Sequence, residues 1–200
     1  MSTAMDVLLR RIRACHVCEA HLPLGPRPVV AAHPDARILV VGQAPGLRVH
    51  QTGIPWDDLS GERLRDWMGV DRSTFYDEHQ IAIAPIGFCY PGRKGGGDAP
   101  PRPECAPLWH PPLLQLLPNI ELTILIGQYA IARYLGKQRK QNLTETVRTC
   151  RDYLPDYLPL VHPSPRNQPW LQRHPWFAEE VLPLLKDRVQ HALSATASPA

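Results

Sequence analysis

The sequence predicts an α/β fold, a three-layer αβα sandwich with a central, mostly four-stranded parallel sheet. Two observations point to it: short runs of apolar, largely β-branched residues recur along the chain, and segments with helical periodicity separate them. The run Ile-Leu-Val-Val at 38–41 has no polar residue to face water, as expected for a strand covered on both faces. Strands that alternate with helices are joined by crossover connections, which produce a parallel sheet. The expected strands are residues 38–41, 80–86, 122–126 and 158–161.

The first expected helix covers residues 5–12, where apolar residues recur at helical spacing. A second helix is expected to take Ser60 as its N-cap and to end at Gly69. The remaining helices are expected at residues 113–117, 128–135, 143–153 and 177–193, the last with a kink at Pro183.

The composition is that of one globular domain. Of the 200 residues, 44% are hydrophobic and 20% are charged, which suits a single domain over residues 1–193 with a flexible tail at 194–200. No apolar run reaches the ~18 residues of a membrane span, and residues 1–13 lack the apolar core of a signal peptide. We therefore expect a cytoplasmic protein that acts as a monomer without membrane contact. The net charge of +3 is compatible with a nucleic-acid partner but does not establish one.

The loop after the first expected strand is the centre of the chain's organisation, and it reads Gly42-Gln43-Ala44-Pro45-Gly46. Its glycines permit backbone conformations and close approaches that a side chain would block, and its proline stiffens the backbone. Open α/β sheets bind their ligands at the carboxyl ends of strands, where this loop lies. The loop therefore predicts one wall of a cleft, although an ordinary turn could have the same sequence.

A second restricted loop follows the last expected strand, with the sequence His162-Pro163-Ser164-Pro165-Arg166-Asn167. The two prolines hold the backbone around Ser164. Because parallel strands end at the same sheet edge, we expect His162 to face the first loop across the cleft. A single histidine is often structural, but this placement favours a functional role.

Several motifs in this chain occur in the order in which the uracil-DNA glycosylase superfamily has them. They are Gly42-Gln-Ala-Pro-Gly46, Thr52-Gly-Ile-Pro-Trp56, Ser60-Gly61, Leu125-Ile-Gly127, Tyr134-Leu-Gly136 and His162-Pro-Ser-Pro165. The chain resembles this superfamily from about Cys15 to the last helix, and most of all its iron–sulfur group, whose first motif is Gly-Glu-Ala-Pro-Gly. The ending His-Pro-Ser-Pro-Arg-Asn is more similar to the single-strand-selective monofunctional branch.

The resemblance implies an enzyme that flips a base out of DNA and reads it in a pocket. By the resemblance, Trp56 stacks on the uracil ring, and His162 donates a hydrogen bond to uracil O2. Gly42, Ala44 and Pro45 belong to the substrate-binding loop, and backbone N–H groups around Gln43 and Ala44 support the same oxygen. The alternative for Trp56 is a place in the hydrophobic core.

Two residues of the second loop are implied to contact DNA. Arg166 occupies the position of the wedge that fills the space left by the flipped base, although a solvated arginine on a phosphate is the alternative. Ser164 is implied to bind a phosphate near the flipped nucleotide. These motifs contain no lysine, which predicts hydrolysis rather than strand cleavage through a Schiff base.

The sequence departs from the superfamily at three places. Gln43 stands where the iron–sulfur group has glutamate, and it can orient a water but cannot act as a base. Asp57, with Asp58, is the nearest carboxylate in the sequence, although either could be a surface charge or a helix-start residue. Pro85 stands where an asparagine usually reads the base, four residues before a cysteine. The glycine-rich run 93–97 is also unusual, and we interpret it as a mobile surface loop.

Four cysteines have the spacing of the iron–sulfur group: Cys15 and Cys18 form Cys-x2-Cys, and Cys89 and Cys105 are separated by fifteen residues. The resemblance implies a structural 4Fe-4S cluster on these four thiolates. Zinc on the same residues and four buried thiols without metal are the alternatives. Cys150 is expected to pack in a helix.

Together these features predict a monofunctional DNA glycosylase that hydrolyses the N-glycosidic bond of uracil, or a related deaminated base, in base excision repair. His162, Gln43 and Asp57 are the expected catalytic residues. The alternative is a non-catalytic protein of the same fold that binds uracil-containing or damaged DNA, which the missing carboxylate and asparagine would suit. A nucleotide-binding enzyme is disfavoured because no Gly-x-Gly-x-x-Gly follows the first strand.

Overall fold

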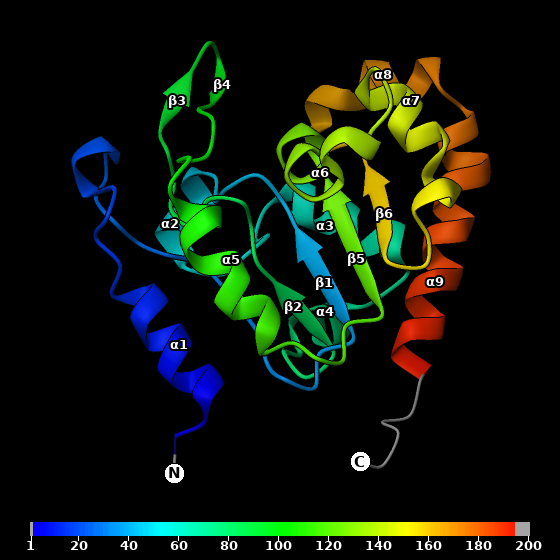
Figure 1. The fold of residues 1–200 in the computed structure, drawn as a ribbon. Helices are drawn as coiled ribbons and strands as arrows, with labels where there is room; N and C mark the ends of the chain where they lie inside the picture. The colour runs from blue at the N-terminus through cyan, green and yellow to red at the C-terminus, as the bar shows by residue number, and fades with distance from the viewer. Residues whose placement is uncertain (1, 195–200) are drawn as a thin grey trace.

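The computed structural model describes residues 2–194 and confirms the predicted fold class (Figure 1). A four-stranded sheet has the order β2-β1-β5-β6, and every neighbouring pair is parallel. Its strands are β1 (Ile38–Val41), β2 (Ile81–Ile83), β5 (Leu122–Ile126) and β6 (Tyr157–Leu160). Strand β1 lies between β2 and β5, so the loop that follows β1 emerges near the middle of the sheet edge.

The two faces of the sheet are covered by different helices, as the alternation of side chains along a strand requires. Leu39 and Val41 of β1 belong to one hydrophobic cluster with α1 (Ala4–Arg13), α5 (Cys105–Gln115) and α6 (Gly127–Leu135). Ile38 and Val40 belong to the other, with α3 (Leu59–Met68) and α9 (Leu182–Ser194). Figure 1 shows α1 and α5 on one side of the sheet and α9 on the other. Both faces are therefore buried, which explains the continuous apolar runs.

Short helices complete the described chain. They are α2 (Leu47–Thr52), α4 (Arg72–Tyr76), α7 (Leu143–Arg148) and α8 (Gln168–Arg173), with the 3₁₀ turns η1 (Glu19–His21), η2 (Gly136–Gln138), η3 (Cys150–Tyr153) and η4 (Pro165–Asn167). The segment η5 (Phe177–Val181) is a π-helical turn directly before α9. In residues 2–194, no helix combines the length and the apolar character needed to cross a membrane. Residues 195–200 of the expected tail lie outside the described part, and Ser194 is the last residue of α9.

Two expected helix starts were wrong. Helix α5 begins at Cys105, not at residue 113, and continues through Pro111 and Pro112. Its buried residues Ala106, Trp109, His110 and Leu113 recur at helical spacing, so packing of this face outweighs the lost hydrogen bonds. Helix α3 has Asp58 as its N-cap, because this carboxylate accepts the Gly61 N–H at 2.9 Å and Ser60 lies inside the helix.

The glycine-rich run is an ordered β-hairpin rather than the expected mobile loop. Strands β3 (Arg93–Lys94) and β4 (Gly97–Asp98) pair antiparallel across Gly95 and Gly96, which have φ of 59° and 80°. Two consecutive residues with positive φ form the turn that matches the twist of a hairpin, and glycine adopts it without strain. In Figure 1 this hairpin projects beyond the body at the end to which the arrow of β1 points.

Candidate active site

A cavity of about 400 Å³ opens at the carboxyl ends of β1 and β6. Its walls come from the loop after β1, the loop after β6, the segment before α3 and the β3–β4 hairpin. The sequence-predicted residues among those that line it are Gly42, Gln43, Ala44, Pro45, Trp56, His162, Ser164 and Arg166. The described residues that line the cavity also include Asp58, Pro85, Tyr90 and Asp98, but not Asp57. The fold thus brings both motif loops to one site.

Trp56 forms one wall of the cavity and has a left-handed backbone, with φ of 55°, which is uncommon for a bulky residue. Its carbonyl oxygen accepts the Tyr76 hydroxyl at 3.2 Å and an Arg65 guanidinium N–H at 3.4 Å. Two glycines give it room. A Cβ at Gly61 would lie 1.8 Å from the Trp56 carbonyl oxygen, and a Cβ at Gly42 would lie 2.8 Å from its ring. These contacts hold a strained residue at the cavity, a pattern common at functional sites.

His162 is oriented by its own loop. The Ser164 N–H donates to Nδ1 of His162 at 3.2 Å, and the Asn167 side-chain amide donates to the His162 carbonyl at 2.7 Å. With Nδ1 accepting, the neutral ring carries its proton on Nε2, which leaves a hydrogen-bond donor at the cavity. The ring centroid lies 5.5 Å from that of Trp56. Burial lowers the pKa of His162, and the nearby Asp58 charge opposes this shift.

Three carboxylates lie around the cavity, and their partners differ. Asp57, expected from the sequence to activate water, pairs with Arg72 at 3.2 Å and with Arg48 at 3.9 Å. Asp58 lines the cavity but caps α3. Asp98 lines the cavity as part of the hairpin. The role of Asp57 stays a prediction, and the structure places the other two closer to the cleft. Asp98 was missed because only the hairpin brings it there, although a Gly-Gly turn flanked by strand residues signals a hairpin.

Gln43 stands where the motif of the iron–sulfur group has glutamate. Its side-chain amide does not point to open space. Its Nε2 donates to the Ala99 carbonyl at 3.0 Å. The Gln43 carbonyl accepts the Gly87 N–H at 2.9 Å, and the Gly42 carbonyl accepts the Ile86 N–H at 2.9 Å. The loop is therefore fixed to the segment after β2 by its backbone and to the hairpin by the Gln43 side chain.

Pro85, which replaces the base-reading asparagine, is held by a buried histidine. The His110 ring lies 3.0 Å from the Pro85 carbonyl through Nε2 and 2.7 Å from the Tyr134 hydroxyl through Nδ1. Donation by the Nε2 proton and acceptance from Tyr134 satisfy a neutral ring. Burial lowers the pKa of His110 and raises that of Tyr134, so this link stays uncharged at neutral pH.

Lowered histidine pKa values predict that stability falls on acidification. Burial lowers the pKa of His50, His110 and His162 below 6.5 in the folded chain. Below pH 6.5 the unfolded chain therefore binds protons that the folded chain does not, so the free energy of unfolding decreases as pH falls. Urea unfolding at pH 7.5 and 5.5 should show this loss. His110→Gln should reduce the dependence of the free energy of unfolding on pH by up to about 1.4 kcal/mol per pH unit. An unchanged dependence in this variant would contradict the lowered pKa of His110.

The four cysteines form a second, separate group. Burial is the main cause that raises the pKa of Cys18, of Cys89 to about 11 and of Cys105 to about 12, and neighbouring thiols of the group add to each shift. Cys18 and Cys89 pack with Leu22 in a small cluster, and the Phe88 N–H donates to the Cys105 sulfur at 3.3 Å. Segments far apart in the sequence thus bring their thiols together. Cys150, in η3, is buried in the hydrophobic cluster that also contains residues of α9, as expected for a packing residue.

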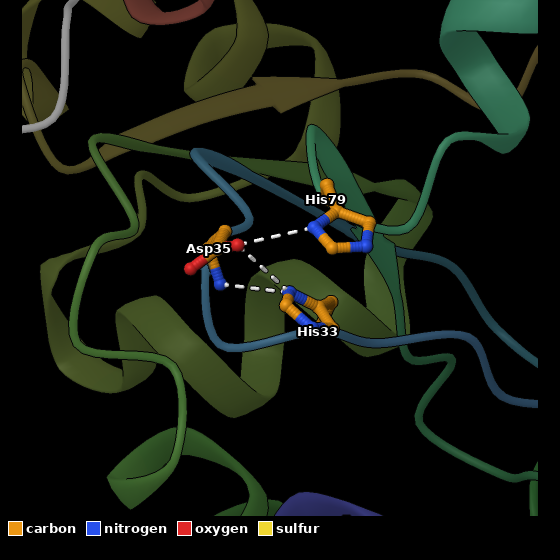
Figure 2. A group of neighbouring side chains, drawn as sticks. All are labelled: His33, Asp35 and His79. Atoms are coloured by element: carbon orange, nitrogen blue, oxygen red, sulfur yellow. Dashed lines mark hydrogen bonds and ion pairs between the residues drawn. The ribbon is translucent and has the colours of Figure 1, made fainter.

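A further group of possible metal ligands, His33, Asp35 and His79, lies before β1 and β2, at the amino ends of the strands (Figure 2). The Nδ1 atoms of His33 and His79 lie 3.3 and 3.0 Å from one Asp35 oxygen. The Asp35 N–H also donates to His33 Nδ1 at 3.2 Å, and the ring centroids are 3.7 Å apart. These contacts join two neighbouring segments and account for the arrangement, and the cavity is at the other end of the sheet.

Comparison with known proteins shows the family of this chain. The sequence model of the Uracil DNA glycosylase superfamily matches residues 30–186, which include both cavity loops. The type-4 uracil-DNA glycosylase of Thermotoga maritima is 24% identical over 163 residues, which cover 80% of this chain and 81% of that protein. Since the superfamily match spans well over half of the sequence, the chain belongs to the uracil DNA glycosylase superfamily and is a glycosylase-type hydrolase.

Proposed function

We propose that this protein removes uracil, or a related deaminated base, from DNA by hydrolysing the N-glycosidic bond of a flipped nucleotide. The observation that carries the proposal is the neutral His162, whose Nε2–H is left as a donor beside Trp56 in a cavity walled by the Gly42–Gly46 loop. An aromatic face next to a fixed donor suits a planar base with a carbonyl oxygen.

Departure of the base develops negative charge on it and positive charge on the sugar. In this proposal, Trp56 stacks on the base and the His162 Nε2–H donates to its O2 as charge accumulates there. A preorganised donor in a dry site stabilises such charge by roughly 3 kcal/mol. Backbone N–H groups of Gln43 and Ala44 add to this stabilisation, and Gly42 and Pro45 shape the loop. The lowered pKa of His162 keeps the ring neutral near pH 7, so the Ser164 contact is retained.

DNA contacts are assigned to the loop after β6. Arg166 is exposed at the cavity, with its guanidinium beside Gly97 of the hairpin, where it could fill the space left by the flipped base. Ser164 lies at the cavity edge and is proposed to bind a phosphate. Among the described residues that line the cavity there is no lysine, which favours a water nucleophile over a Schiff base.

The thiols of Cys15, Cys18, Cys89 and Cys105 are proposed to hold a 4Fe-4S cluster. Three of them have raised pKa values because of burial, so their thiolates need a compensating cation. Four cysteine thiolates are the usual ligands of such a cluster, and zinc on the same four thiolates is the alternative. The cluster would join the segment after α1 to the ends of the loop between Cys89 and Cys105.

Anaerobically purified protein tests the cluster. We expect broad visible absorbance and about four irons and four sulfides per chain. Cys89→Ser should abolish this absorbance and lower the melting temperature, whereas Cys150→Ser should leave the absorbance unchanged. One zinc per chain with no iron would contradict the proposal.

Base excision is tested with labelled oligonucleotides that contain a single uracil, as single strands and as duplexes, followed by alkali. Cleavage at the uracil after alkali, with no cleavage before it, is the expected result for a monofunctional glycosylase. Retarded mobility specific to the uracil strand without cleavage would instead support the non-catalytic binding protein. Thymine and hypoxanthine oligonucleotides of the same sequence define the base range.

A further inference from the structure

We propose that Asp98, carried by the β3–β4 hairpin, holds the attacking water in place of the carboxylate missing from the Gly42–Gly46 loop. Gln43 is then a positioning residue that fixes the hairpin. This inference rests on the proposed function, because it concerns the same cavity and the same reaction.

The hairpin places Asp98 at the cavity by backbone geometry. Its Cα is paired with that of Arg93 in the ladder, and the Ala99 N–H donates to the Gly92 carbonyl at 2.8 Å just beyond it. An Asp98 carboxylate oxygen lies 3.5 Å from the position that a Cβ on Gly46 would occupy. The carboxylate is therefore at the end of the motif loop itself, although it comes from a segment about fifty residues later in the chain.

Gln43 connects the two segments in a way that glutamate could not. Its amide N–H donates to the Ala99 carbonyl, the residue next to Asp98. A carboxylate at position 43 has no proton to donate and would repel that carbonyl oxygen. Glutamine in the motif and a carboxylate on the hairpin are thus complementary. Gln43 is uncharged and binds the residue next to Asp98, and Asp98 provides the negative charge.

Among the described residues, Asp98 is also the cavity carboxylate with no partner on either oxygen. Asp57 is paired with Arg72, and an oxygen of Asp58 accepts the Gly61 N–H. Within residues 2–194, Asp98 has neither an ion pair within 4.0 Å nor a side-chain hydrogen bond.

The charged groups around Asp98 come from three elements. Arg93 lies opposite it on the hairpin, Arg166 comes from the loop after β6, and Asp58 comes from the start of α3. Asp98 is exposed as a residue, and partial desolvation of its carboxylate is the main cause that raises its pKa, with the two arginines opposing the shift and Asp58 adding to it. A carboxylate with a raised pKa accepts a water proton more readily than an ordinary one, which suits a general base.

The step is a hydrolysis in which all atoms are accounted for. The water oxygen forms a bond to C1′ of the deoxyribose while the bond from C1′ to the base nitrogen breaks. The bonding electron pair leaves on the base, where the His162 N–H faces it. One water proton passes to the Asp98 carboxylate, which later releases it to solvent.

The test is the single-turnover rate of uracil release from a single-stranded oligonucleotide. Asp98→Asn should lower this rate by at least 100-fold, the usual scale of a general base, with half-saturation by DNA changed less than threefold. Asp66→Asn, an equal charge change on the exposed face of α3, is the matched control and should keep the wild-type rate. Asp98→Ser is a second variant with the same expected result, and melting temperatures establish that each variant is folded.

A wild-type rate in both Asp98 variants would overturn this inference while leaving the proposed function intact. A large loss in Asp57→Asn together with a wild-type rate in Asp98→Asn would return the role to Asp57. An inactive wild-type enzyme would instead contradict the proposed function itself.

The role of Gln43 is tested by a double-mutant cycle. Gln43→Ala should lower the rate about tenfold, because a displaced catalytic group loses its alignment. In the Asp98→Asn background the same change should cost less than twofold, since Gln43 acts only through Asp98. Independent losses that multiply would show that Gln43 acts on the water or the base directly, and would contradict its positioning role.

Discussion

Replacing His162 with alanine is expected to reduce uracil excision by about 10²- to 10³-fold while the protein stays folded. The imidazole is the donor proposed to meet the negative charge on the departing base, and loss of one such donor costs roughly 3 to 4 kcal/mol of transition-state stabilisation. The rate of base release should fall more than the affinity for DNA, because the donor acts most strongly after the bond begins to break. Single-turnover release of base, with binding measured separately by fluorescence anisotropy, separates the two quantities.

The control for His162→Ala is His21→Ala, which removes an exposed histidine on η1 outside the cavity. This variant should retain wild-type excision. A His162→Ala enzyme with full activity and a normal melting temperature would remove His162 from the reaction and leave the cavity without its assigned donor.

Replacing Gly61 with alanine is expected to destabilise the protein, although glycine-to-alanine changes inside helices usually stabilise it by about 1 kcal/mol. Gly61 lies in the first turn of α3, and its Cβ would be 1.8 Å from the Trp56 carbonyl oxygen. That atom is backbone, so the loop must move and its contacts with Tyr76 and Arg65 are lost. We expect a loss of about 2 to 3 kcal/mol in the free energy of unfolding.

Asp66→Ala on the same helix is the matched control, since Asp66 is exposed and alanine raises helix propensity there. Urea unfolding should place the two variants on opposite sides of the wild type. Excision should also fall in Gly61→Ala because Trp56 no longer forms the cavity wall. A Gly61→Ala protein more stable than the wild type would contradict the close approach of Trp56.

The sheet was predictable because each strand is apolar on both faces, so its sequence signal does not depend on its neighbours. One departure occurs where packing between distant segments decides, and another where two neighbouring residues are both suited to the N-cap. Pro111 and Pro112 predict a break, but burial of Trp109 and Leu113 keeps α5 continuous. Ser60 resembles an N-cap. Asp58, two residues earlier, takes this position instead, because its carboxylate accepts the Gly61 N–H.

The cavity residues were predictable where a motif lies in one stretch of chain, as in the two loops that contain Gln43 and His162. The contribution of Asp98 was not, because it depends on how a hairpin folds over a sheet edge. The left-handed backbone of Trp56 is likewise invisible in its local sequence, since it depends on the absent side chain of Gly61 and on hydrogen bonds from α3 and α4.

Direct detection of the released base shows whether this protein hydrolyses the N-glycosidic bond of uracil in DNA. The purified protein should be incubated with a uracil-containing single-stranded oligonucleotide, and both products measured by mass spectrometry. We expect free uracil and an intact strand with one abasic site in equal amounts, with release strongly reduced in His162→Ala. An unmodified oligonucleotide after prolonged incubation with excess folded wild-type protein would contradict the proposed function.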